Sequence, residues 1–168
     1  AHADAVHGAE ICRDLQDRLV MIARVSDAGA FVNTNALTLK RSHGDYSVMQ
    51  LLYDGSEIKA VLDFVNAGEV PIAWELIRSY SYMDCTFNAA RLAAYTNEYR
   101  RYAEVSMDDL RYMPYLYLGQ LLSSTYGYKQ YLQTGDEELL AFGRWRTEMC
   151  RYLIANAGEV SAELVRLA

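Results

Sequence analysis

The hydrophobic pattern divides the chain into three zones, and the first is helical. Between Asp4 and Val25, apolar residues recur every three to five positions and charged residues separate them. This spacing is typical of an amphipathic helix with one apolar face. Residues 26–35 contain glycine, asparagine and aspartate, and are predicted to form a loop.

The second zone, residues 37–64, contains two short apolar runs. Residues 49–53 and 58–62 stand on either side of the turn signal Asp54-Gly55. Two such runs around an Asp-Gly pair predict a β-hairpin. No other segment has a comparably clear strand pattern, so we expect this hairpin to be the only strand pair.

The third zone is helical from Pro71 onward. Proline suits the first turn of a helix, so a helix is predicted from Pro71 to Tyr82. Leucine and tyrosines recur at helical spacing over residues 87–103 and predict a second helix. The chain is therefore expected to be mainly α, with a small β element ahead of a helical bundle.

The remaining helices are predicted from capping and stop signals. Residues 106–109 resemble a capping box, with Asp in place of the usual Glu or Gln, and begin a helix that reaches Gln133. Pro114 predicts a bend or restart within that helix. Two more helices are expected, over residues 136–156 and, as a short element, after Gly158.

Composition restricts the class of protein. The chain has 168 residues, of which 52% are hydrophobic and 23% charged, with a net charge of −6. This is enough apolar material for the core of one globular domain, and it excludes a disordered chain. A membrane-spanning helix needs roughly 18 consecutive apolar residues, and no such run occurs. The acidic balance argues against a nucleic-acid-binding surface and favours a neutral or cationic partner.

The cysteines and the first residues indicate a cytoplasmic protein. Cys12, Cys85 and Cys150 are odd in number and far apart, without the spacing of a zinc site or a disulfide framework. The chain begins without the basic and then apolar pattern of a signal peptide. We therefore expect reduced thiols and a cytoplasmic location.

The tyrosines allow two interpretations. The sequence contains 14 tyrosines. They could form an aromatic pocket for a cationic ligand, or pack a core from which their hydroxyls reach water. Core packing is the favoured interpretation. Six of them lie close together: Tyr112, Tyr115, Tyr117, Tyr126, Tyr128 and Tyr131.

The residues that could carry out chemistry stand just before and just after the predicted hairpin in the sequence. Asp45 stands two residues after His43, Gln50 five residues after Asp45, and Asp63 directly after the second strand. Transfer of a phosphoryl group from a nucleotide needs a carboxylate to orient the acceptor hydroxyl, and oxygen ligands for Mg²⁺. Kinases supply these groups from a His-x-Asp-x-x-x-x-Asn loop, two strands and an Asp-Phe turn. The hairpin is expected to return Asp63 beside Gln50, so that both reach one metal ion.

The tripeptide His43-Gly44-Asp45 resembles that of the aminoglycoside phosphotransferase and choline/homoserine kinase-like family. The resemblance covers roughly residues 39–79 and corresponds to the C-terminal lobe of a protein-kinase-like fold. It implies that Asp45 is the catalytic base and that Asp63 binds the metal. It also implies that His43 and Glu75 support the catalytic loop.

The same resemblance implies cofactors and partners. ATP or GTP would be the phosphoryl donor, and Asp63 and Gln50 would bind Mg²⁺ and with it the nucleotide. The acceptor would be a hydroxyl of a small molecule such as an aminoglycoside, choline or homoserine, and an acidic lobe suits a cationic acceptor. No nucleic acid or membrane partner is expected. The residues proposed to contact the acceptor are Glu69, Trp74, Tyr80 and Tyr82.

The sequence departs from the family pattern in three places. Gln50 replaces the usual Asn, and Ser47-Val48 replaces the usual His-Pro. The third departure concerns the lysine of an N-terminal β-sheet that grips the nucleotide phosphates. None of Lys40, Lys59 and Lys129 lies on such a sheet ahead of the loop. Residues 1–168 are therefore predicted to be the C-terminal, catalytic and substrate-binding lobe without its nucleotide lobe, and inactive in isolation.

Two alternatives remain open at this stage. The first is a catalytically inactive kinase-like module that binds a ligand, motivated by Gln50, because an extra methylene shifts the amide oxygen of a metal ligand. The second is a helical interaction domain unrelated to kinases. It treats Asp45 as a turn residue and predicts that Asp45 and Asp63 lie far apart.

Overall fold

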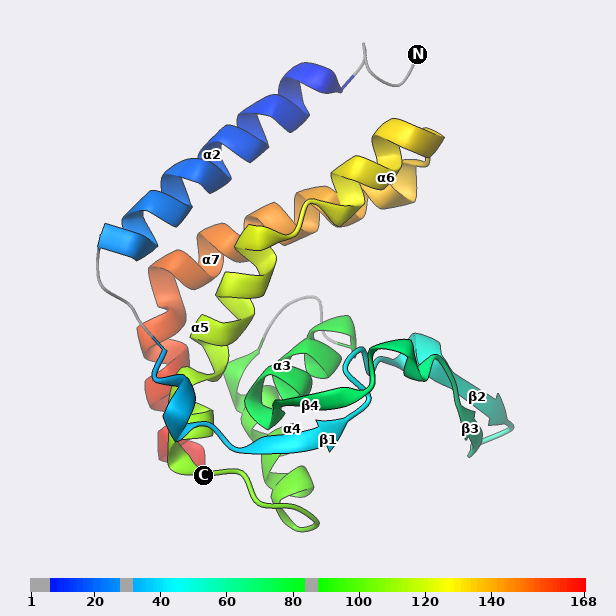
Figure 1. Cartoon of the computed structure of the whole chain (residues 1–168), viewed down its shortest axis with the longest axis vertical. Coiled ribbons are helices and arrows are strands. Elements are labelled where there is room, and N and C mark those ends of the chain that lie inside the picture. The colour runs from blue at the N-terminus through cyan, green and yellow to red at the C-terminus, as the bar shows by residue number, and fades with distance from the viewer. Residues whose placement is uncertain (1–6, 28–31, 84–87) are drawn as a thin grey trace. The chain divides into compact units, whose positions relative to one another are not determined.

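The computed structural model describes residues 7–27, 32–83 and 88–168, and Figure 1 labels its helices and strands along the chain. The chain is mainly helical, as predicted. The α-helices are α2 (Gly8–Asp27), α3 (Ile72–Met83), α4 (Ala89–Arg100), α5 (Met107–Ser123), α6 (Tyr126–Thr134) and α7 (Glu137–Leu167). The strands are β1 (Leu39–Ser42), β2 (Leu51–Asp54), β3 (Glu57–Val61) and β4 (Gly68–Pro71), and the 3-10 helices are η1 (Thr34–Ala36), η2 (Val48–Gln50) and η3 (Phe64–Asn66).

The first three predicted helices are confirmed. Helix α2 covers the predicted first helix from Gly8 onward, and the earlier residues 4–6 lie outside the described residues. Residues 28–31 of the predicted loop and Phe87 are also outside them. Helix α3 begins one residue after Pro71. Helix α4 is capped by Asn88, whose side chain accepts a hydrogen bond from the backbone N–H of Arg91 at 3.0 Å.

The helix predicted over residues 106–133 is divided, but not by a restart at Pro114. Helix α5 continues through Pro114 and ends at Ser123, and α6 begins at Tyr126. The buried Arg18 explains this end point, because its guanidinium donates to the backbone carbonyl of Ser124 at 2.6 Å and to that of Leu121 at 3.3 Å. A helix C-terminus leaves carbonyls without partners inside the helix, and here a side chain distant in sequence satisfies two of them.

The prediction of a separate terminal helix after Gly158 is also wrong. Helix α7 runs without a break from Glu137 to Leu167. A glycine inside a helix costs only about 1 kcal/mol relative to alanine. The buried apolar residues Leu153, Val160 and Leu164 continue along one helix on both sides of Gly158. Packing therefore outweighs the low helix propensity of one residue.

The hairpin is confirmed, with each strand offset by one or two residues from the predicted run. Strand β2 pairs antiparallel with β3, and a turn at Gly55-Ser56 joins them. Gly55 has a φ of 61°, which favours glycine. The ends of the predicted runs lie outside the strands, since Met49 belongs to η2 and Leu62 follows β3.

A second strand pair contradicts the expectation of a single one. Strands β1 and β4 pair antiparallel, from Leu39 opposite Pro71 to Ser42 opposite Gly68. Both strands are short, and neither has the alternating apolar pattern that would predict it. The pair also closes around the whole hairpin, so no local turn signal reveals it. Its strands lead directly into the loop at His43 and into α3.

The chain forms two compact units, which we describe separately. The first unit comprises residues 1–31 and 118–157, and the second comprises residues 32–117 and 158–168. Both α5 and α7 therefore contribute residues to each unit. The candidate motif lies entirely within the second unit.

The second unit is built around α3. This helix contacts β1, β4, η2 and α4, and its residues Ile72, Leu76 and Ile77 are buried. The predicted capping box is present at the start of α5. The side chain of Asp109 accepts from the backbone N–H of Ser106 at 2.8 Å, and the hydroxyl of Ser106 accepts from the backbone N–H of Asp109 at 3.0 Å.

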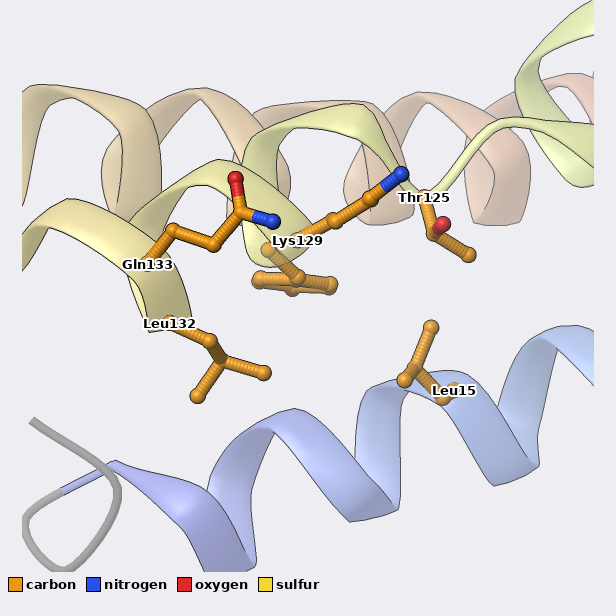
Figure 2. A pocket seen from close by; sticks show the side chains of 6 residues that line it. Leu15, Thr125, Lys129, Leu132 and Gln133 are labelled. Carbon is orange, nitrogen blue, oxygen red and sulfur yellow. The ribbon is translucent and has the colours of Figure 1, made fainter. Parts of the chain in front are cut away.

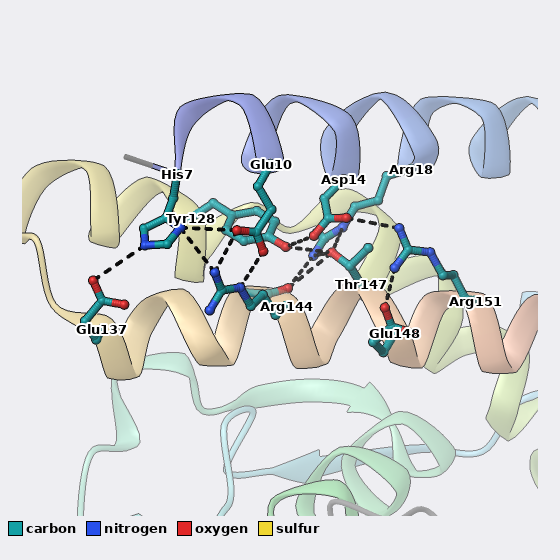
Figure 3. Close-up of polar contacts among 11 residues, drawn as sticks. His7, Glu10, Asp14, Arg18, Tyr128, Glu137, Arg144, Thr147, Glu148 and Arg151 are labelled. Carbon is teal, nitrogen blue, oxygen red and sulfur yellow. Dashed lines mark hydrogen bonds and ion pairs between the residues drawn. The ribbon is translucent and has the colours of Figure 1, made fainter. Parts of the chain in front are cut away.

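The first unit contains a polar network between α2 and α7, drawn in Figure 3. Arg18 donates to the hydroxyl of Thr147 at 2.8 and 3.0 Å, and Arg144 forms two hydrogen bonds with Glu10 at 2.5 and 2.7 Å. The Arg144 guanidinium lowers the pKa of Glu10 to about 2. Burial, together with donation of its hydroxyl to Asp14, raises the pKa of Tyr128 to about 12.

The tyrosines are divided between core and surface. Tyr117, Tyr128 and Tyr131 are buried, which confirms core packing for these three, whereas Tyr126 is exposed. Cys12 and Cys150 are free thiols, the first exposed and the second buried, and Cys85 lies outside the described residues. Within the described ranges, no helix combines the length and the apolar character needed to cross a membrane.

Candidate functional site

The loop after β1 carries the candidate base. His43 is buried, and Gly44 adopts a φ of 77° before the chain turns into Asp45. A Cβ atom at Gly44 would lie 2.7 Å from the carbonyl carbon of Asn66 and closer still to its oxygen. Only glycine permits both this backbone conformation and this close approach. The loop that carries Asp45 is therefore packed directly against η3, the segment that follows Asp63.

Glu75 lies in the first turn of α3 and forms hydrogen bonds with the backbone of the same loop. Its carboxylate accepts from the backbone N–H of Gly44 at 2.9 Å and from that of Tyr46 at 2.8 Å. These two amides flank Asp45 in sequence. Glu75 itself is buried, and hydrogen bonds to an ionised acceptor are stronger than neutral ones. The backbone on both sides of Asp45 is thus fixed to a helix.

His43 links the loop to the end of the hairpin. Its Nε2 lies 2.6 Å from the backbone carbonyl oxygen of Leu62. A carbonyl can only accept, so Nε2 carries the proton and donates. The ring packs against Tyr46 and, at 4.7 Å between centroids, against Phe64. Leu62 directly precedes Asp63, so His43 connects the two motif segments.

The hairpin brings Gln50 and Asp63 to the same end of the strands. The backbone N–H of Leu62 donates to the carbonyl of Gln50 at 2.8 Å, which continues the β2–β3 ladder by one pair. The side-chain oxygen of Gln50 accepts a hydrogen bond from the hydroxyl of Ser47. Asp63 directly follows Leu62, whose backbone is hydrogen-bonded to that of Gln50. The backbones of Gln50 and Asp63 are therefore close together, as the spacing of the motif predicts.

Asp63 adopts a left-handed backbone conformation. Its φ is 62° and its ψ is 58°, and it is the one non-glycine residue with a positive φ in the described part of the chain. Such conformations cost about 1–3 kcal/mol and occur preferentially at functional sites. The side chain is exposed and makes no capping hydrogen bond to η3. A carboxylate is thus held on a strained turn with its oxygens available.

The donor chemistry of these residues fits Mg²⁺. Among the residues that the structure describes, no group of three or more His, Cys, Asp or Glu side chains gathers into a metal site. Mg²⁺ does not require such a group, because it is commonly held by one or two carboxylates together with substrate phosphates and water. The Asp63 carboxylate and the Gln50 carboxamide are both oxygen donors, which suits this mode of binding.

A residue that the sequence did not identify contacts Asp45. The guanidinium of Arg78, on α3, forms an ion pair with the Asp45 carboxylate. It lies over the rings of Trp74, at 5.6 Å from the centroid, and Tyr82, at 5.1 Å. Arg78 appears in the sequence only as one residue of a predicted helix, and no local pattern links it to Asp45.

The four residues predicted to contact the acceptor lie in different environments. Tyr80 is buried, and its hydroxyl donates to the backbone carbonyl of Asn88 at 3.0 Å. Glu69 is exposed on β4, opposite Arg41. Trp74 and Tyr82 flank Arg78. Acceptor contact by these residues stays a prediction.

A pocket of about 360 Å³ lies beside the loop after β1 in the second unit. It is lined by His43, Tyr46 and Glu75 from the region of the motif and by Tyr95 and Tyr99 from α4. Burial raises the pKa of Tyr46 and that of Tyr99 above the usual value. No motif in the sequence predicts this pocket.

The first unit has a more apolar pocket of about 340 Å³ between α2 and α6. Figure 2 shows Leu15 of α2 facing Leu132 of α6, with Lys129 and Gln133 beside them. It contains none of the motif residues. The candidate chemistry is therefore confined to the second unit.

Comparison with protein families agrees with this geometry. The family model of the phosphotransferase enzyme family matches residues 7–105, more than half of the chain. The chain belongs to this family, and the match is wider than the residues 39–79 that carry the motif. It includes α2 and α4 as well as the motif. Searches among curated proteins and among solved structures gave no significant match.

Proposed function

We propose that this chain provides the catalytic lobe of a kinase that transfers the γ-phosphoryl group of ATP or GTP to a hydroxyl of a small molecule. Membership of the family supports a phosphotransferase, and it removes the alternative of a helical domain unrelated to kinases. The observation that carries the proposal is the connection between the two motif segments. His43 joins them at Leu62, and Gly44 contacts Asn66.

In this mechanism Asp45 orients the acceptor hydroxyl and accepts its proton. The hydroxyl oxygen forms a bond to the γ-phosphorus while the bond to the β,γ-bridging oxygen breaks, and the nucleoside diphosphate leaves. Most of the rate enhancement of such a reaction comes from positioning and charge stabilisation. The hydrogen bonds from Gly44 and Tyr46 to Glu75 supply the rigidity that positioning needs.

Asp63 and Gln50 are the residues that would hold Mg²⁺, which neutralises charge on the phosphates when bound. The left-handed turn at Asp63 leaves its carboxylate free of local capping bonds. Ser47 fixes the carboxamide of Gln50 through its hydroxyl. We propose that this hydrogen bond compensates for the extra methylene of Gln relative to the usual Asn.

We further propose that a nucleotide lobe outside this chain covers the hairpin. Apolar side chains around the motif are exposed, with 81% of Met49 and 87% of Val65 accessible, and Leu52, Tyr53 and Ile58 are also exposed. A cluster of exposed apolar residues of this kind marks a contact surface. Of the three lysines, Lys40 lies on β1, Lys59 on β3 beside Glu57, and Lys129 on α6.

The acceptor is proposed to be a small alcohol such as an aminoglycoside, choline or a homoserine-like compound. The test is nucleoside diphosphate release by the complete gene product that contains this chain, with Mg·ATP or Mg·GTP and a panel of such acceptors. Asp45→Asn should abolish turnover. Asp108→Asn is the control, because Asp108 is exposed and pairs with Arg111 on the surface of α5.

A catalytically inactive binding module is the second candidate, favoured by Gln50 at the metal position. It predicts that the protein binds Mg·ATP or an acceptor without releasing diphosphate. Turnover that disappears in Asp45→Asn and persists in Asp108→Asn excludes this module. Acceptor binding without turnover across the panel excludes the kinase.

A further inference from the structure

We propose that Arg78 is a positioning residue for Asp45, and this inference rests on the proposed role of Asp45 as the base. Its guanidinium Nη2 pairs with Oδ1 of the Asp45 carboxylate. The Arg78 side chain is only 11% exposed, against 27% for Asp45. The partner of the candidate base is therefore set into the body of the second unit, and the base itself remains within reach of solvent.

Aromatic rings fix the direction of the guanidinium. Trp74, Arg78 and Tyr82 are spaced four residues apart on α3, which places them on one face of the helix. Arg78 lies over both rings. A planar guanidinium between aromatic rings loses little further freedom when it forms a hydrogen bond. The arginine thus offers Asp45 a partner that is already oriented.

Two residues of α3 hold two different parts of the catalytic loop. Glu75 accepts from the amides of Gly44 and Tyr46, which fixes the backbone around Asp45. Arg78, one helical turn later, holds the side chain of Asp45. The ion pair occupies Oδ1 and leaves Oδ2 to accept the proton of a hydroxyl. Together these contacts define both where the carboxylate lies and which oxygen faces the reaction.

Stability alone does not account for Arg78. Its Nη1 is buried and has no hydrogen-bond partner in the described residues, and an unsatisfied buried donor is costly. A buried ion pair is also weak evidence for stability, because apolar residues of similar volume often serve as well. The Arg78–Asp45 pair therefore carries a cost in folding free energy, and it contacts the candidate base. These two properties fit a role in the reaction.

The test compares variants of the complete gene product in the diphosphate-release assay. Arg78→Met keeps the bulk between the rings and removes the charge. Misplacing a reacting group can cost about 100-fold in rate, so kcat should fall by about 10- to 100-fold, with the KM for Mg·ATP unchanged. Arg78→Lys keeps the charge and loses the planar fork, so its kcat should lie between those of Arg78→Met and wild type. Added guanidinium ion should restore part of the activity of Arg78→Ala.

Arg101→Met is the matched control. Arg101 also pairs with a carboxylate, Glu98, at 2.9 Å and lies over a ring, that of Tyr102, at 5.9 Å, but it is exposed and remote from the motif. Its kcat should equal that of wild type. Circular dichroism and urea unfolding establish that each variant is folded. If Arg78→Met does not fold, Arg78→Lys carries the test, with a reduced kcat as the expected result.

The outcomes separate this inference from the proposed function. Wild-type kcat in both Arg78→Met and Arg78→Lys overturns the positioning role and leaves the kinase proposal intact. A kcat above that of wild type also overturns it, because the ion pair would then be blocking the base. Absence of turnover in the wild-type protein overturns the proposed function itself, and the role of Arg78 falls with it.

Discussion

Gly44 and Asn66 touch through their backbones, and this contact joins the loop of Asp45 to the turn of Asp63. The contact leaves no space for a β-carbon at position 44, where the φ is 77°. The glycine between His43 and Asp45 therefore has a steric purpose. It allows the segment before the hairpin and the segment after it to pack at backbone distance.

Substitution of Gly44 should separate the two segments. Gly44→Ala adds a methyl group that collides with the backbone of Asn66, so we expect a loss of activity in the complete protein and a loss of about 1–3 kcal/mol in unfolding free energy, as for overpacked sites. Urea denaturation and the release assay measure these effects. Gly55→Ala is the matched control, since Gly55 also has a positive φ of 61° but no atom within 4 Å of a Cβ. Equal effects of the two substitutions would show that backbone strain alone, and not the contact, matters at Gly44.

Removal of the Glu75 carboxylate should loosen the loop that carries Asp45. Glu75→Gln keeps one acceptor oxygen and presents an NH₂ group to an amide that needs an acceptor. One buried amide is then unsatisfied, which costs about 1–3 kcal/mol. Hydrogen exchange of the Gly44 and Tyr46 amides should become faster, which NMR measures without any activity assay. Glu98→Gln, at an exposed site, should leave both exchange rates unchanged, and unchanged rates in Glu75→Gln would contradict the prediction.

The capping aspartate of α5 should be a main contributor to the stability of the second unit. Asp109 is fully buried, and its carboxylate accepts from the backbone N–H of Ser106 at 2.8 Å. It also accepts from the backbone N–H of Thr38, just before β1, at 2.9 Å. Asp109→Ala removes the acceptor of both amides, and each unsatisfied buried amide costs about 1–3 kcal/mol. Asp109→Ala should therefore lower the unfolding free energy by about 2–4 kcal/mol. The neighbouring Asp108→Ala is the control, and a similar loss there would argue against a specific role for Asp109.

The ion pair of Glu10 and Arg144 should make the first unit sensitive to acid. The pKa of Glu10 falls from 4.5 to about 2 because of its hydrogen bonds with Arg144. Its contribution is therefore present above pH 4.5 and is lost as the pH falls towards 2. Because the pair is partly exposed, the loss should be at most about 1 kcal/mol.

Urea unfolding of wild type and Glu10→Gln between pH 7 and pH 2 measures this contribution. The two curves should differ at neutral pH and converge at low pH. Glu163→Gln is the control, because Glu163 makes a similar two-bond contact with Arg166, but within one turn of the same helix. A constant difference between wild type and Glu10→Gln over the whole range would rule out the pair as the cause.

Local signals in the sequence predicted most helices and the hairpin. Periodicity located α2 and α4, Pro71 located the start of α3, and the Asp54-Gly55 pair predicted the turn between β2 and β3 to within one residue. The errors arose where a distant residue decides the outcome. Arg18 donates to the carbonyl of Ser124 just after the end of α5, and β1 pairs with β4, which lies beyond the whole hairpin in the sequence.

The candidate site was predictable to the same extent. The spacing of His43, Asp45 and Asp63 indicated the chemistry, and the link between His43 and Leu62 agrees with their expected proximity. Arg78 could not be found in this way, because its contact with Asp45 depends on how α3 packs against the loop. The roles of these side chains in catalysis stay predictions.

The end of α7 determines when the second unit can be completed during synthesis. Residues 158–168 belong to this unit although residues 118–157 do not. Asn97 and Arg100 of α4 donate to the carbonyls of Leu167 and Ala168, at 2.8 and 3.0 Å, and Ser161 donates to the carbonyl of Arg111 at 2.8 Å. The ribosome must therefore synthesise residues 158–168 before the unit that bears Asp45 can make all of its contacts. Nascent chains stalled within α7 should carry an intact motif in an unfinished fold.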